Sequence, residues 1–313
     1  MIANFFKQSK PIVFIILGFV LSACYFIEIG INQQVGLSFE SLGIIILKYL
    51  VLISTFILFE VKIKYFQIQT GHSYVILFFV LLTSFLLQDI RHNSEVFAFG
   101  FLSLATTRLL NLSTAWNVKN SIFESVALIV VASFFYRPVL VFLVLVFVFT
   151  VIFTKSRWRY YVIPVFGVAT VVILTQVFYI QYYDEVAHLQ DLLPSFRKDF
   201  SLLENEVSVY MAVFWATAVL VFFYQIYSVK QVRSLYHRQM ASVFLTFLFL
   251  AIATMLFEGS TISGLWLLSL WPFCIYLGDF VSRIKRKLWL QIAFWLFVVI
   301  SLVFYSIRLF GLI

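Results

Sequence analysis

Long apolar runs separated by short polar intervals recur along the whole chain. A helix rises about 1.5 Å per residue and the hydrocarbon core of a membrane is about 30 Å thick, so one crossing takes about 20 residues. Dividing the chain at its polar intervals therefore predicts an all-α, polytopic transmembrane bundle of about eleven spans. The expected spans are Pro11 to Gly30, Leu42 to Glu60, Ser73 to Leu87, Val96 to Leu110, the two runs on either side of Arg137 and Pro138, Tyr160 to Ile180, Val207 to Ser228, Ala241 to Phe257, Ile262 to Leu277 and Leu288 to Tyr305.

The stretch from Ser121 to Pro164 indicates how these spans are oriented. Two apolar runs meet at Arg137 and Pro138, and the second ends in the basic patch from Lys155 to Arg159. Arg137 is then expected at one membrane face and the basic patch at the other. Because Lys and Arg concentrate in cytoplasmic loops, the basic patch is expected inside, Arg137 outside and the N-terminus in the cytoplasm.

A polar segment at about 184–206 is expected to form an amphipathic helical loop on the external side. Its apolar residues recur every three or four positions, from Val186 through Phe196 to Leu203, which is the spacing of one helix face. Pro194 predicts a kink or two short helices, because proline is not tolerated in the middle of a helix. The loop either covers the bundle or grips a substrate near the membrane.

Composition agrees with a membrane protein: 63% of the residues are hydrophobic and 12% are charged. No polar stretch is long enough for a separate soluble domain, so residues 1–313 are expected to form a single integral-membrane domain. The net charge of +8 comes from Lys and Arg residues that concentrate in alternate loops, as in membrane proteins. These residues do not form a groove of stacked aromatic and basic side chains that binds bases, which argues against nucleic acid as a partner. Localisation in the cell inner membrane, with membrane lipids as partners, is expected.

Ionisable residues at membrane depth or at the external rim are the candidates for substrate binding, because burying them is costly. Lys48 lies inside the second expected span and either extends to the outer interface or lines a site. An arginine guanidinium group can bind two phosphate oxygens at once, so the cations on the external side suit a phosphorylated lipid carrier. These external cations are Arg91, His92, Arg137 and Arg197. The alternative is that they form surface ion pairs with Glu95, Asp89 and Asp199.

External carboxylates are the candidates for a general base, and Glu28 and Glu40 come from the first external loop. The other acids on that face are Asp89, Glu95, Asp184 and Glu185. The four histidines divide evenly between the two sides of the membrane, and the two cysteines lie in different apolar segments. Neither pattern supplies the clustered ligands of a zinc or iron site. No metal and no other cofactor is therefore expected.

Two resemblances extend these expectations. The stretches MIANFFKQSKP, SEVFAFGFLSLATTRLLNLS and RWRYYVIPVFG resemble a family of uncharacterised polytopic inner-membrane proteins of Bacteroidota. The segment SVALIVVASFFYRPVLVFLVLVFVFTVIFTKSRWRYY resembles the middle helices of C-type integral-membrane glycosyltransferases, which use polyprenyl-phosphate sugars. The second likeness implies that Arg137 is the cation at the turn and that Glu28 or Glu40 is the catalytic acid of the first external loop.

The expected function is accordingly cell-envelope biogenesis, as a glycosyltransferase-like protein that binds a polyprenyl-phosphate-linked sugar at the periplasmic face. Two alternatives stay open. One is a non-enzymatic membrane subunit of a secretion or motility complex. The other is a lipid or small-solute transporter, which needs a polar path through the bundle.

Overall fold

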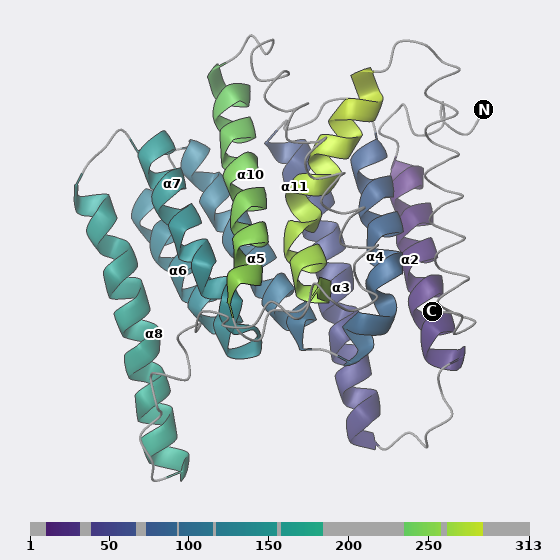
Figure 1. The fold of residues 1–313 in the computed structure, drawn as a ribbon, viewed down its shortest axis with the longest axis horizontal. Coiled ribbons are helices and arrows are strands. Elements are labelled where there is room, and N and C mark those ends of the chain that lie inside the picture. Colours follow the sequence, from purple (N-terminus) through teal and green to yellow (C-terminus); the bar gives the residue numbers. More distant parts are fainter. Residues whose placement is uncertain are drawn as a thin grey trace. The chain divides into compact units, whose positions relative to one another are not determined.

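The computed structural model describes residues 11–31, 39–66, 73–92, 94–114, 117–154, 158–183, 235–257 and 262–283. Within these ranges the protein is helical and contains no β-strand (Figure 1). Six described helices are long and apolar enough to cross a membrane, and three shorter apolar helices accompany them. The prediction of an all-α membrane protein is confirmed at this level. The larger number of spans, their topology and the inner-membrane location stay predictions.

The described helices follow the apolar runs of the sequence closely. In chain order they are α2 (Pro11–Ile31), α3 (Phe39–Tyr65), α4 (Tyr74–His92), α5 (Glu95–Leu110), η1 (Asn111–Thr114), α6 (Val118–Phe135), η2 (Arg137–Phe142), α7 (Leu143–Phe153), α8 (Arg159–Tyr183), α10 (Leu235–Ala253), η5 (Thr254–Leu256) and α11 (Ile262–Arg283). The expected spans Val207 to Ser228 and Leu288 to Tyr305, and the amphipathic loop at 184–206, lie outside the described residues.

Several helices, among them α3, α4 and α11, are longer than the apolar runs that predicted them. Helix α3 begins at Phe39 and ends at Tyr65, beyond the expected span on both sides. Helix α4 continues to His92, which adds one more turn and places Arg91 and His92 inside the helix, where a connecting segment was expected. An apolar run shows only which part of a helix can lie in hydrocarbon. The helix itself can extend into the polar interface, because its backbone hydrogen bonds do not depend on apolar side chains.

The chain divides into two compact units, one formed by Met1–Val96 with Leu270–Ile313 and the other by Phe97–Ser269. In the first unit α4 is the central helix, because it packs against both α2 and α3 and is buried along most of its length. The expectation of a single integral-membrane domain over residues 1–313 stays a prediction.

Aromatic side chains fill the core of the first unit. The ring of Phe59 on α3 lies with its centroid 5.0 Å from that of Phe79 on α4 and 4.8 Å from that of Trp271 on α11. Helix α11 also approaches α4 very closely, since a Cβ atom added at Gly278 would lie 2.4 Å from the Cγ2 atom of Val75. Small residues at such contacts let membrane helices pack backbone against backbone.

In the second unit, α6 packs against α8 and α7 packs against α10. The ring of Phe142 in η2 lies 4.9 Å from that of Phe247 on α10, between centroids. The half-buried Tyr236 at the start of α10 hydrogen-bonds to the Ser113 side chain in η1. These contacts hold the helical hairpin on either side of Arg137 within the unit.

Candidate functional site

The buried face of α2 ends in a carboxylate. Its buried residues recur every four positions, which is the spacing of a helix ridge that packs into a neighbouring groove. Glu28 lies one turn after Tyr25 on this face and is only 6% exposed. The predicted catalytic acid therefore belongs to the interior of the first unit. The apolar members of the face are Val13, Leu17, Leu21, Tyr25 and Ile29.

The buried face of α3 begins with a cation. Lys48 is 4% exposed and is followed on the same face by Leu52, Phe56 and Phe59. A lysine that extended along the lipid-facing surface to the interface would retain much of its accessible area. Of the two interpretations that the sequence left open, the burial supports a lysine that lines the interior of the bundle.

Two hydrogen bonds join α2 and α3 close to these charged residues. The Tyr25 hydroxyl donates to the carbonyl oxygen of Ile45 at 2.8 Å, and the hydroxyls of Ser22 and Tyr49 lie 2.8 Å apart. Glu28 is three residues from Tyr25, and Lys48 is three residues from Ile45. Because the paired residues show that α2 and α3 run in opposite directions, Glu28 and Lys48 lie on opposite sides of this contact, about 9 Å apart along the helix axes. Both are buried in the first unit.

Glu95 completes the group of buried charges. It is 5% exposed at the first residue of α5, and it interacts electrostatically with Lys48. The N-terminus of a helix carries partial positive charge, which favours a carboxylate there. Lys48 and the helix terminus therefore both stabilise the negative charge of Glu95. We refer to Glu28, Lys48 and Glu95 together as the buried charge cluster.

The cluster has the groups that phosphate binding and proton transfer require. An ammonium group in a water-poor site attracts a phosphate strongly, because the low dielectric constant strengthens charge interactions. A carboxylate near it is able to accept a proton from a hydroxyl group. Among the described residues, no group of three or more His, Cys, Asp or Glu side chains has the arrangement of a metal site.

Arg137 forms a second, separate candidate in the other unit. Tyr136 is extended, with φ −153° and ψ 97°, and ends α6. The 3-10 helix η2 then begins at Arg137, with Pro138 in its first turn. The backbone N–H of Val139 donates to the carbonyl oxygen of Tyr136 at 3.1 Å, which closes the turn. Arg137 is exposed while Tyr136 and Pro138 are buried. The predicted tight turn with an accessible guanidinium group is thus present.

The remaining predicted residues lie at helix ends or outside the described part of the chain. Glu40 lies in the first turn of α3, and Arg91 and His92 end α4. Arg197 lies outside the described residues.

Two buried carboxylates were not among the predicted site residues. In the sequence, Glu95 is one of several external acids that could act as a general base or pair with external cations, and Glu60 is only the end of a span. Glu60 is buried on the same face of α3 as Lys48 and pairs with Lys64. Positions 48, 52, 56 and 60 are each four residues apart, which places them on one face of a helix. This spacing could have identified Glu60 as a residue on the same face as Lys48. The interaction of Glu95 with Lys48 depends on the fold and has no such pattern in the sequence.

Comparison of the chain with protein-family models, with curated proteins and with solved structures finds no match.

Proposed function

We propose that this is an inner-membrane protein of cell-envelope biogenesis that binds a polyprenyl-phosphate-linked sugar and acts as a glycosyltransferase. The observation that carries the proposal is the burial of Glu28 and Lys48 beside the contact between α2 and α3. Both were candidate site residues for independent reasons, one as an acid and one as a cation. They are buried on either side of that contact, and Glu95 is the carboxylate that interacts electrostatically with Lys48.

In this mechanism Lys48 binds the phosphate that links the sugar to the polyprenyl chain. Glu28 accepts the proton of the acceptor hydroxyl group as its oxygen attacks the anomeric carbon. The bond between that carbon and the phosphate oxygen breaks, and polyprenyl phosphate leaves with the bonding electron pair. Lys48 stabilises the negative charge that grows on the leaving phosphate. The exposed Arg137 of the other unit is proposed as a separate phosphate-binding residue, because guanidinium groups bind phosphate in a bidentate manner.

Binding of undecaprenyl phosphate to the purified protein in nanodiscs tests the role of Lys48. A charge-assisted hydrogen bond contributes about 1.5–3 kcal/mol, so Lys48→Gln is expected to weaken binding by about 10-fold to 100-fold. Lys48→Arg keeps the charge and is expected to keep most of the affinity. Lys119→Gln removes an exposed lysine elsewhere and serves as the matched control. Unchanged affinity in a monodisperse Lys48→Gln protein would contradict the proposal.

Glu28→Gln tests the chemical step separately from binding. The amide keeps the shape of the side chain but accepts no proton. The variant is expected to bind undecaprenyl phosphate like the wild type and to lose the surface-glycan phenotype of the cell. A normal glycan profile with Glu28→Gln would remove the acid from the mechanism and leave only a binding protein.

The buried charge cluster also favours a second function, a lipid or small-solute transporter. Ionisable residues inside membrane bundles often mark the path of a substrate or an ion. A transporter requires substrate to cross sealed proteoliposomes, whereas a glycosyltransferase requires only access from one side. Flux of a polyprenyl phosphate across the bilayer that stops in Lys48→Gln would select the transporter.

A further inference from the structure

Helix α8 is attached to its unit by one narrow stripe. Its buried residues are Pro164, Gly167 and Val171, at spacings of three and four, and they face α6. A Cβ atom added at Gly167 would lie 2.9 Å from the Cγ1 atom of Val126 on α6. The close contact at Gly167 fixes one side of the helix. The rest of its circumference carries large, exposed side chains.

The exposed side chains between the ends of α8 are suited to hydrocarbon. From Tyr160 to Tyr183 the helix contains no Asp, Glu, Lys or Arg. The Thr170 and Thr175 hydroxyls donate to the carbonyl oxygens of Phe166 and Val171, both at 2.8 Å. These hydroxyls therefore need no water. The most exposed apolar residues are Val165, Phe166, Ile173, Leu174 and Val177.

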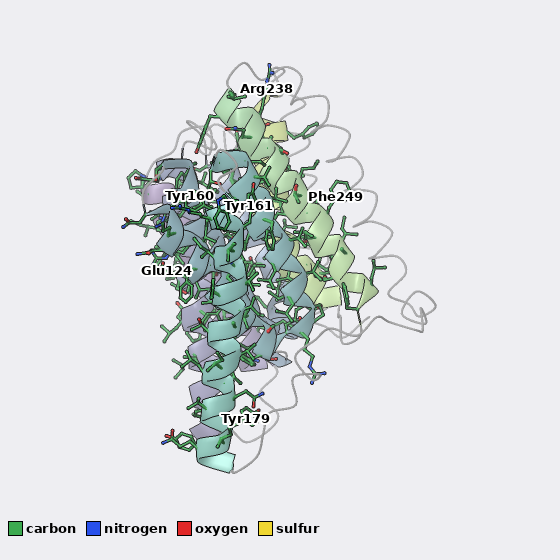
Figure 2. The ribbon with its side chains drawn as sticks, turned by 90° about the vertical axis from the view of Figure 1, so that its left-hand side faces the viewer. Glu124, Tyr160, Tyr161, Tyr179, Arg238 and Phe249 are labelled. Atoms are coloured by element: carbon green, nitrogen blue, oxygen red, sulfur yellow. The ribbon has the colours of Figure 1, made fainter. Side chains whose placement is uncertain are left out.

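Aromatic residues with polar tips lie at both ends of this apolar region. Trp158, Tyr160 and Tyr161 lie at the start of α8, beside Arg159, and Tyr179 and Tyr182 lie near its end. Figure 2 shows Tyr160 and Tyr161 toward one end of the helix and Tyr179 near the other. The rise from Tyr161 to Tyr179 is about 27 Å, close to the thickness of the hydrocarbon core. Trp and Tyr gather at both membrane interfaces in membrane proteins.

We infer that α8 crosses the bilayer as a lipid-facing helix, with acyl chains in contact with its exposed side and the two aromatic belts at the two headgroup layers. Three observations select lipid over water or protein. The exposed residues extend over most of the circumference, the two threonine hydroxyls between the belts bond within the helix, and the belts are spaced by one bilayer thickness. This inference is independent of the proposed enzymatic function.

Spin labels on single cysteines test what covers α8. The starting protein carries Cys24→Ser and Cys274→Ala, since these are the two native cysteines. Cysteines are then placed at Phe166, Ile173 and Val177 within the apolar region, and at Trp158 and Tyr182 in the belts. A cysteine at Val171, on the buried stripe, is the matched control. Proteoliposomes are exposed to oxygen, which dissolves in hydrocarbon, and to a water-soluble nickel chelate.

The three apolar positions are expected to be relaxed by oxygen and protected from the chelate, and the Val171 position to be protected from both. The positions at Trp158 and Tyr182 are expected to be reached by the chelate. Chelate access at Phe166, Ile173 and Val177 would mean water at this surface. Protection of these positions from both reagents would mean that protein covers the helix. Either result would overturn the inference.

Discussion

The interaction between Lys48 and Glu95 leads to the most specific prediction about stability. Both residues are almost fully buried, at 4% and 5% exposure, so their electrostatic attraction acts between buried rather than surface charges. Removing one partner of a buried pair costs about 3–5 kcal/mol, because the remaining charge stays in a poor environment. The dipole of α5 compensates Glu95 by about 0.3–1 kcal/mol. We therefore expect Lys48→Met to destabilise the protein by about 3 kcal/mol.

The double variant separates the charge interaction from packing. Replacing a buried ion pair by apolar residues of similar size is often neutral or stabilising. Lys48→Met with Glu95→Leu is thus expected to recover most of the stability lost in Lys48→Met alone. The corresponding coupling free energy is expected to exceed about 1 kcal/mol. Reversible unfolding in mixed detergent micelles, followed by tryptophan fluorescence, measures each free energy of unfolding.

The ion pair between Arg108 and Glu124 supplies the matched control. Its atoms lie 2.9 Å apart, but the two side chains are 51% and 44% exposed. Exposed pairs contribute about 0–1 kcal/mol, so Arg108→Met is expected to change stability little. The reasoning would be refuted if Lys48→Met cost no more than Arg108→Met, or if the effects of Lys48→Met and Glu95→Leu were additive.

Two further predictions concern a close helix contact and the half-buried Tyr236. Gly278→Ala is expected to lower the free energy of unfolding by about 1–3 kcal/mol, because the new Cβ would meet both the side chain and the backbone of Val75. Gly30→Ala is the control, because a Cβ atom at Gly30 would have open space around it. If the two variants lost equal stability in detergent unfolding, the close contact at Gly278 would be contradicted. Burial raises the pKa of Tyr236, with the hydrogen bond to Ser113 acting in the opposite sense. A raised pKa in the folded state gives stability that is present below the unfolded pKa and lost as the pH rises through the folded pKa. Tyr236→Phe is therefore expected to lose less stability than the wild type between neutral pH and a pH above about 10, and parallel pH profiles would contradict this.

The positions of the helices were largely predictable, and α2 and α8 show why. Both follow uninterrupted apolar runs whose ends are marked by charged or aromatic residues. The ends of α3 and α4 were less predictable, because their terminal turns are polar and resemble loops in composition. The candidate site was predicted in part. The sequence identifies Glu28 as a candidate catalytic acid and Lys48 as a candidate binding cation, but Glu95 is one of several acids at the ends of spans.

The sequence by itself determined that this chain forms apolar helices, since a backbone in hydrocarbon has to satisfy its hydrogen bonds within each helix. It also determined which ionisable residues interrupt the apolar runs. It did not determine which side of each helix faces the interior, because a helix that is apolar on all sides has no polar face to mark its exposed surface. Only the packing of α2 and α3 in the first unit decided that Lys48 and Glu28 are buried there. Only the start of α5 decided that Glu95 is the carboxylate with which Lys48 interacts.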